Sequence, residues 1–327
     1  MIRSVAKKIW NRWPALKAAV LMLDDLRWGI RLQGGHIETD SGATHAELSD
    51  EESVRYIEEV FADYKRYGKL DKLNGIAAEI GQGDNVGVAM LMRQDGCHQV
   101  DLVDRYESRR DPQQQDRIYD ALSKKYGLEW LRSGHGWNDR EMPGVVPKIG
   151  WPAEEYFEEY RRDRGPSYDA IVSRSVLEHL YNPLDALESM ASCLKPRGRL
   201  IHKIDFRDHG LFTPQHHELT FLTFPRFIYR LMTRNSGRPN RILYHQYRDR
   251  LERLKTTGLI DYSLYVTRLT GIGDITPHQL YEESPPAMWQ QASEYVDRYR
   301  AQFAREFHHV DSRDLSVAGI FLVVTRT

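Results

Sequence analysis

The sequence has few cysteines, no excess charge of either sign and no long apolar run. Its only cysteines among 327 residues are Cys97 and Cys193, so no disulfide framework is indicated and a reducing, cytoplasmic location is expected. A formal net charge of −1 argues against general polyanion binding, and therefore against a nucleic-acid partner. No apolar run approaches the roughly 20 residues of a membrane span. With 41% apolar residues, the chain can bury one large core with appendages.

A glycine-rich turn between a strand and a helix is the most informative feature that is present. An apolar run over 75–80 predicts a buried strand, and residues 86–92 predict the helix that follows. Gly81 and Gly83 allow a sharp turn and let a ligand approach the backbone without a Cβ in the way. Such a turn is the usual crevice for an adenosine-containing ligand in an open α/β sheet.

The residues around the turn indicate which ligand it suits. The spacing Gly81-x-Gly83-x-x-x-Gly87 is one residue too long for the dinucleotide fingerprint. Asp84 would also place negative charge where a pyrophosphate rests. Glu79 suits a ligand with a positive amino or sulfonium group, and Gln82 and Asp84 of the same turn are further candidates for binding that ligand. The alternative is an ordinary strand–helix turn with solvated acids.

A second strand is predicted over 97–104, and it ends in an acid. Asp104 lies 21 residues beyond Gly83, about where an acid at a strand tip holds the ribose hydroxyls of a bound nucleoside. A helix N-cap is the alternative role for this aspartate.

Two more strands are predicted further along. Residues 145–150 form the third, and Ala153 and Glu154 at the start of the next helix are candidates for the edge of the purine ring. Residues 168–172 form the fourth, with the cofactor candidates Ser173 and Arg174 directly after it. A helix from Pro183 to about Cys193, strands over 199–204, 260–266 and 316–324, and a helix over 244–257 complete the pattern.

Together these segments resemble class I S-adenosylmethionine-dependent methyltransferases. The resemblance is carried, in order, by Glu79-Ile80-Gly81-Gln82-Gly83, Val103-Asp104, Tyr168-Asp169-Ala170-Ile171-Val172, Val176-Leu177-Glu178-His179 and Leu194-Lys195-Pro196-Arg197-Gly198. It implies a doubly wound α/β fold with a seven-stranded, mostly parallel, Rossmann-like sheet whose last strand is reversed. It also implies S-adenosyl-L-methionine as cofactor.

The expected organisation is an N-terminal helical region over 1–70 and a methyltransferase domain over 71–327. Insertions are expected at about 106–144, 211–243 and 274–309, and the second should form a helical lid over the acceptor. Residues 1–13 predict a basic amphipathic helix that could contact an anionic membrane surface. Packing on its own domain, or on a second copy in a homo-oligomer, is the alternative.

The acceptor side requires alignment, exclusion of water and, for a hydroxyl acceptor, removal of a proton. His209 is the first candidate for the base, because an unperturbed histidine titrates near neutral pH. Asp205 or Asp208 could orient it, and His179 is the second candidate. A purely structural role is the alternative for both histidines. Candidates for binding the acceptor are Asp208, Asn240 and Arg241.

A divalent metal is a further alternative on this side. Its ligands would be Asp205, Asp208, His209, His216 and His217. Their spacing contains no diagnostic ligand pattern, and a solvated loop explains them equally, so we expect no metal.

The predicted activity is O-methylation of a small-molecule or glycan hydroxyl. The aromatic side chains of the segment 211–243 suit a sugar, and the chain is similar to methyltransferases of bacterial surface-glycan pathways. One alternative is C-methylation of a quinone or lipid precursor, and another is a non-catalytic partner subunit with the same fold. The sequence Ser173-Arg174-Ser175-Val176 lacks the Asn/Asp-Pro-Pro-aromatic motif of nucleic-acid amino-methyltransferases.

Overall fold

The computed structural model describes residues 12–35, 37–39, 42–134 and 136–327. Most of the predicted amphipathic segment at 1–13 therefore lies outside the described residues. Helix α2 (Pro14–Gln33) comes first, followed by the short strand β1 (Glu38–Thr39), the 3₁₀ turn η1 (His45–Glu47) and α3 (Asp50–Gly68). Ser49 and Glu52 form a reciprocal capping box at the start of α3.

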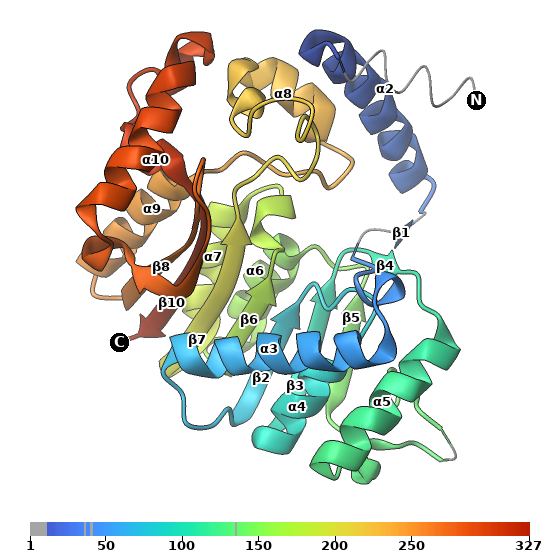
Figure 1. Ribbon diagram of the computed structural model, residues 1–327. Helices are drawn as coiled ribbons and strands as arrows, with labels where there is room; N and C mark the ends of the chain where they lie inside the picture. Colours follow the sequence, from blue (N-terminus) through green and yellow to red (C-terminus); the bar gives the residue numbers. More distant parts are fainter. Residues whose placement is uncertain (1–11, 36, 40–41, 135) are drawn as a thin grey trace.

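The core of the molecule is an eight-stranded sheet in the order β5-β3-β2-β6-β7-β10-β8-β9 (Figure 1). The first five strands in this order are parallel, and β10 lies antiparallel between β7 and β8. The strands are β2 (Gly75–Ile80), β3 (Cys97–Asp104), β5 (Val145–Ile149), β6 (Tyr168–Arg174), β7 (Leu194–Asp205), β8 (Ile260–Leu269), β9 (Gly273–Leu280) and β10 (Val317–Arg326). A mostly parallel α/β sheet with a reversed last strand is thus confirmed.

The predicted count of seven strands is wrong by one. The additional strand is β9, which pairs antiparallel with β8 at the edge of the sheet and falls in the segment that the sequence assigned to an insertion. Its residues are mostly half-buried or exposed, so the strand lacks the apolar alternation that predicts a buried strand. Pro277 lies within it, and proline in a sheet is largely confined to edge strands and bulges.

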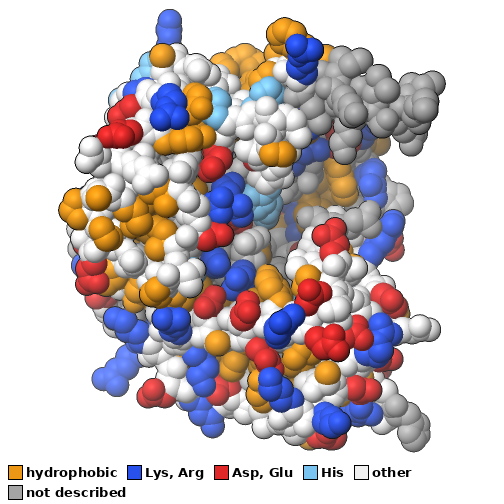
Figure 2. All heavy atoms as spheres, in the orientation of Figure 1, with side chains coloured by type: hydrophobic (Ala, Val, Ile, Leu, Met, Phe, Trp, Pro, Cys, Tyr) orange, Lys and Arg blue, Asp and Glu red, His pale blue; other side chains and the backbone are white. Residues whose placement is uncertain are grey.

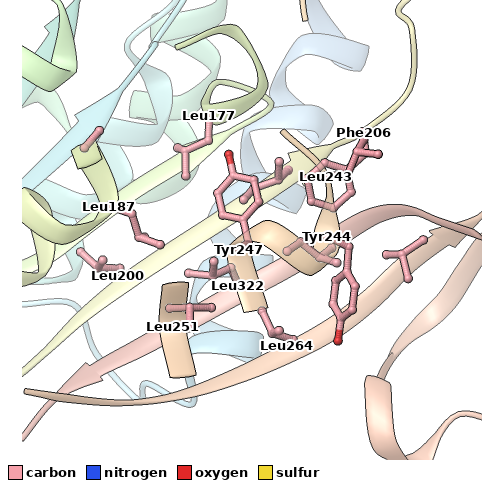
Figure 3. Packing of buried hydrophobic residues seen from close by; sticks show 14 of the residues in the cluster. Leu177, Leu187, Leu200, Phe206, Leu243, Tyr244, Tyr247, Leu251, Leu264 and Leu322 are labelled. Carbon is pink, nitrogen blue, oxygen red and sulfur yellow. The ribbon is translucent and has the colours of Figure 1, made fainter. Parts of the chain in front are cut away.

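Helices cover both faces of the sheet in two layers (Figure 1). One layer is built by α3, α4 (Gly87–Asp95) and α5 (Pro112–Tyr126), and the other by α6 (Ala153–Arg164), α7 (Pro183–Cys193) and α9 (Tyr244–Thr256). Figure 3 shows part of the second layer, where Leu187 of α7 and Leu251 of α9 lie near Leu200 and Leu322 of the sheet. Successive strand residues point to opposite layers, so each strand contributes to both cores.

Helices α2 and α8 (Arg226–Thr233) pack against each other above the sheet (Figure 1). Buried Asp25 of α2 accepts hydrogen bonds from the backbone N–H and side chain of both Asn235 and Ser236. The Arg238 guanidinium pairs with Asp24 of the same helix. The predicted lid segment 211–243 is therefore anchored to the N-terminal region of the chain.

The remaining elements are short or peripheral. They are β4 (Glu107–Ser108), which pairs with β1, the helices α10 (Pro286–Tyr299) and α11 (Ser312–Ser316), and the 3₁₀ turns η2 (Glu129–Leu131), η3 (Leu177–His179), η4 (Thr220–Thr223), η5 (Tyr281–Glu283), η6 (Arg300–Gln302) and η7 (Arg305–Phe307). Within the described parts of the chain, no helix is both long and apolar enough to cross a membrane.

Candidate active site

The glycine turn after β2 is enclosed on two sides. Gly81 and Gly83 have φ values of +69° and +63°, a region that favours glycine. A Cβ on Gly81 would overlap the Val176 side chain, and one on Gly83 would lie 2.5 Å from the Gly42 carbonyl oxygen. Both glycines are therefore required by conformation and by contact.

A cavity of about 160 Å³ lies on one side of the turn. Its wall includes Glu79, Gln82, Tyr64 and Arg174. Glu79 is only 6% exposed, and Glu79 Oε2 and Gln82 Oε1 have no hydrogen-bond partner among the described residues. Burial raises the pKa of Glu79 to about 8. Because an unpaired buried carboxyl costs free energy, this wall suits a ligand that donates hydrogen bonds and carries positive charge.

A second cavity, of about 80 Å³, lies on the other side of the same turn. Gly81 lines both cavities, and Asp104, Ala153 and Glu154 line the second. Asp104 Oδ1 accepts a hydrogen bond of 2.9 Å from the Tyr106 N–H, and burial raises its pKa to about 6. The structure thus brings together the residues predicted for the ribose and the purine.

Several predicted cofactor residues also make contacts that hold the site in shape. The Asp84 carboxylate accepts hydrogen bonds from the backbone N–H groups of His45 (3.3 Å) and Ala46 (3.0 Å), so it fixes the N-terminal loop beside the turn. Glu154 Oε1 accepts from the backbone N–H groups of Tyr181 (2.6 Å) and Asn182 (3.2 Å). Each carboxylate therefore holds in place a loop beside one of the two cavities.

The other two predicted cofactor residues lie at the carboxyl end of β6. Ser173 Oγ lies 2.8 Å from His202 Nδ1, and both side chains are fully buried in the sheet. The Arg174 guanidinium pairs with Asp63 at 3.0 Å and lies over the Tyr56 ring. Arg174 lines the cavity beside Glu79, whereas Ser173 lines neither cavity.

The three predicted catalytic residues come together beyond the carboxyl ends of β6 and β7. The rings of His179 and His209 meet edge to face with centroids 4.9 Å apart, and His209 Nε2 lies 3.5 Å from Asp205 Oδ2. His179 Nδ1 lies 2.7 Å from the Gly237 carbonyl oxygen. Burial lowers the pKa of His179 to about 4, so this histidine is neutral at pH 7.

The Asp205 carboxyl is ionised. Burial alone would raise its pKa, but hydrogen bonds from His209 and Arg207 outweigh burial and hold the pKa well below its usual range. Asp205 therefore offers a carboxylate beside His209, and this is the arrangement that orients an imidazole and stabilises its protonated form.

Glu178, which the sequence places beside His179 without assigning it a role, is also part of this cluster. Its side chain is 2% exposed, Oε1 accepts from the Asp205 N–H at 3.2 Å, and Oε2 has no partner among the described residues. The ligand atoms of Glu178, His179 and His209 lie within 4.8 Å of one another, as a metal site requires. Of the five residues named as the ligands of a possible metal, only His209 belongs to this group. Glu178 precedes His179 in the quoted motif, but only its burial marks it as unusual.

The remaining predicted acceptor residues are divided between loop structure and a large cavity. Asp208 accepts from the backbone N–H groups of Gly210, Phe212 and Thr213, and so shapes the loop after β7. Asn240 and Arg241 line a cavity of about 620 Å³. Figure 2 shows the face of the molecule on which α3 lies, where the surface is hollowed and Lys, Arg and His side chains gather at the edge of the hollow.

The large cavity and the crevice beside Asp104 share the wall formed by residues 179–181. Asn240 is fixed by hydrogen bonds of 2.8 Å from Nδ2 to the carbonyl oxygens of Leu177 and Leu180. Arg241 pairs with Glu306 at 2.5 Å. An acceptor in the large cavity would therefore lie next to His179 and next to the predicted cofactor crevice.

The sequence profile of a methyltransferase domain matches residues 54–253, which is more than half of the chain. The chain belongs to this methyltransferase-domain family. Membership confirms the resemblance that the sequence motifs carry. The matched residues of this methyltransferase include most of α3, the glycine turn, Asp104, His179, His209 and α8. No curated protein matches the chain.

Solved structures with a similar arrangement include a phosphoethanolamine N-methyltransferase of Haemonchus contortus in complex with S-adenosyl-L-methionine. It is 15% identical with a TM-score of 0.39, over 82% of this chain and 51% of that one. A putative sarcosine dimethylglycine methyltransferase from Galdieria sulphuraria is 16% identical with a TM-score of 0.38, over 92% and 97% of the two chains. This methyltransferase thus spans about half the length of the first of these proteins.

Proposed function

We propose that this chain transfers a methyl group from S-adenosyl-L-methionine to a hydroxyl of a small molecule or glycan. The observation that carries the proposal is the buried Glu79 carboxyl beside the Gly81–Gly83 turn, whose Oε2 has no partner among the described residues, with Asp104 on the other side of that turn. A carboxyl oxygen that can accept a hydrogen bond, a backbone turn that borders both cavities and a second acid are the groups that a nucleoside carrying an amino acid needs.

The residues of the crevice fit this cofactor. Glu79 and Gln82 offer oxygen atoms to its ammonium group, and Asp104 offers a carboxylate to its ribose hydroxyls. Ala153, at the start of α6, offers a small apolar contact to the purine. When bound, S-adenosyl-L-methionine supplies a methyl group on a positively charged sulfur.

His209 is the proposed base, supported by Asp205. Because His209 Nε2 faces the Asp205 carboxylate, Nδ1 is the nitrogen left to take the acceptor proton. The imidazolium that forms is then stabilised by the ionised carboxylate. His179 donates from Nδ1 to the Gly237 carbonyl, which leaves its Nε2 to position the acceptor hydroxyl. The buried cysteines, both free thiols, are consistent with the proposed cytoplasmic location.

Calorimetric titration with S-adenosyl-L-methionine and its demethylated product, S-adenosyl-L-homocysteine, tests the cofactor site. We expect one binding site per chain, and a loss of affinity of about tenfold or more in Asp104→Asn, because a neutral amide accepts ribose hydroxyl hydrogen bonds less strongly. Asp71→Asn is the matched control, since Asp71 is exposed and lies outside both cavities. Absence of binding, or equal affinity in Asp104→Asn, would overturn the assignment.

Product release from a panel of hydroxyl-bearing acceptors then tests the reaction. We expect turnover with sugar-containing acceptors and none in the absence of an acceptor. Binding of the cofactor without turnover on any acceptor, including quinone precursors, would instead identify a non-catalytic partner subunit.

A further inference from the structure

The large cavity next to His179 has a strongly basic wall. Arg226, Arg230 and Arg234 follow one another at every fourth position of α8 and its C-cap, so they lie along one side of the helix. Arg238 and Arg241 line the same cavity. A volume of about 620 Å³ is within the usual size of small-molecule sites.

The positive charge of this wall is only partly neutralised. Glu306 is its one carboxylate, and it pairs with Arg241. Arg238 pairs with Asp24. In the part of the chain that the structure describes, the guanidinium groups of Arg226, Arg230 and Arg234 form no ion pair with a carboxylate. Three positive charges that face one cavity repel one another, so an anionic ligand would relieve a cost present in the free protein.

Neutral polar groups of the same wall are also left unpaired. Tyr181 Oη and His245 Nδ1 are buried without a hydrogen-bond partner among the described residues, and both residues line the cavity. Tyr181 also lines the crevice beside Asp104. A ligand that fills the cavity would thus find charged groups at α8 and hydrogen-bonding groups near the cofactor crevice.

The arginines of α8 lie apart from the residues proposed to bind the cofactor. Glu79 and Asp104 lie beside the glycine turn, whereas Arg226, Arg230 and Arg234 line the large cavity and neither of the two cavities at the turn. His179 lies at the junction. An anion bound by the arginines would therefore lie on the acceptor side of His179 rather than in the cavities at the glycine turn.

We propose that the acceptor carries a phosphate or pyrophosphate ester, bound by Arg226, Arg230 and Arg234, while its hydroxyl lies beside His179 and His209. Guanidinium groups match phosphate oxygens in pairs of parallel hydrogen bonds, and several together suit a group with more than one negative charge. This inference rests on the proposed function and adds the substrate class. A nucleoside diphosphate sugar and a lipid-linked sugar pyrophosphate share the required chemistry.

Titration of the full-length protein with inorganic pyrophosphate tests the arginine wall directly. We expect binding that weakens as salt rises, with a loss of about tenfold in each of Arg230→Gln and Arg234→Gln. Arg253→Gln on α9 is the matched control, because Arg253 is an exposed helical arginine outside the cavity. S-adenosyl-L-homocysteine binding is measured on the same samples and should be unchanged in all three variants.

These two titrations separate the two proposals. If the wild-type protein binds S-adenosyl-L-homocysteine but not pyrophosphate, or if Arg230→Gln, Arg234→Gln and Arg253→Gln all bind pyrophosphate like the wild type, the phosphate-bearing acceptor is overturned and the cofactor site stands. If neither ligand binds, both proposals are overturned.

Methyl transfer to a uridine diphosphate sugar and to a sugar linked to a short polyprenyl pyrophosphate in detergent distinguishes the two sources. Turnover of either substrate, with kcat/KM at least tenfold above that of the corresponding neutral methyl glycoside, supports the proposal. Equal kcat/KM for the neutral glycoside, or no turnover of either phosphate ester, contradicts it.

Discussion

Gly42 and Gly83 lie backbone against backbone at the edge of the cofactor crevice. The Asp84 N–H donates a hydrogen bond of 3.2 Å to the Gly42 carbonyl oxygen, and the same oxygen lies 2.5 Å from where a Cβ on Gly83 would be. A loop that precedes α3 thereby becomes a wall of the glycine turn after β2. The N-terminal region thus contributes to the wall of the candidate site.

Gly83→Ala should therefore disturb the crevice more than its backbone conformation alone would require. The new methyl group must displace the loop at Gly42, so we expect cofactor affinity to fall by tenfold or more and the protein to lose on the order of 2 kcal/mol of stability. Calorimetry and urea unfolding measure the two effects.

Gly127→Ala is the control for this change. Gly127 has a similar φ of +68° at the end of α5, but a Cβ there has nothing within 4 Å. It should cost roughly 1–2 kcal/mol from the left-handed conformation alone and leave cofactor binding intact. Equal loss of cofactor affinity in both variants would show that contact with Gly42 is irrelevant.

Glu79→Gln should stabilise the ligand-free protein at alkaline pH. Burial raises the pKa of Glu79 from 4.5 to about 8, so the folded state favours the protonated carboxyl. The stability that the protonated Glu79 carboxyl contributes is complete below about pH 4.5. It is lost as pH rises through 8, because the folded protein must then bury a charge. Urea unfolding at pH 5 and pH 8 measures the free energy of unfolding of both proteins. Relative to wild type, this free energy should rise in the variant between the two pH values, by on the order of a few kcal/mol at pH 8.

The same variant should bind S-adenosyl-L-methionine at least tenfold more weakly, since the amide cannot offer a charge to the ammonium group. Glu158→Gln, an exposed position of α6, controls for the loss of one negative charge. A variant with wild-type affinity would remove Glu79 from the cofactor site.

The sequence was sufficient for most of the sheet because its central strands are strongly apolar. The strands over 75–80 and 168–172, and the run 316–324, have buried residues at nearly every position, so period and length identify them. Strand β9 was not predicted, because an edge strand needs no alternation of buried and exposed residues and tolerates a proline such as Pro277. Its existence depends on pairing with β8, which no local pattern encodes.

Some residues of the candidate site could likewise be placed from the sequence and others could not. Asp104 and Ala153 come together with the glycine turn because the carboxyl ends of neighbouring parallel strands share one edge of a sheet. Gly42 and Tyr64 reach the site only through the packing of the N-terminal region, which depends on contacts distant in sequence. The spacing of the arginines at every fourth position predicts that they share one side of a helix. The cavity that they line depends on η7 and α9, which form its other walls and are distant in the sequence.

His209→Ala should lower kcat by roughly 10²–10⁴-fold, the usual contribution of a general base, with the affinity for S-adenosyl-L-homocysteine unchanged. His179→Ala should lower kcat less, because burial lowers the pKa of His179 to about 4 and makes it the weaker base. Initial rates on the first productive acceptor measure both. His98→Ala provides the control, as His98 is exposed at the start of β3. Near-normal turnover by both His209→Ala and His179→Ala would eliminate histidine base catalysis.

A chelator should leave methyl transfer unchanged. Glu178, His179 and His209 have ligand atoms close enough to share a metal ion, but their existing contacts compete with that role. His209 Nε2 faces the Asp205 carboxylate at 3.5 Å and His179 Nδ1 donates to the Gly237 carbonyl, so of the three side chains only Glu178 has an oxygen, Oε2, without a partner among the described residues. A metal would need a ligand atom of each side chain at about 2.1 Å from one point.

Initial rates before and after dialysis against EDTA measure this, with elemental analysis of the same samples. A loss of activity that returns with one divalent ion, and that is abolished in Glu178→Gln while S-adenosyl-L-homocysteine still binds, would instead assign the cluster to a metal. His209 would then act as a ligand, and the proton of the acceptor hydroxyl would be lost through metal coordination rather than to the imidazole.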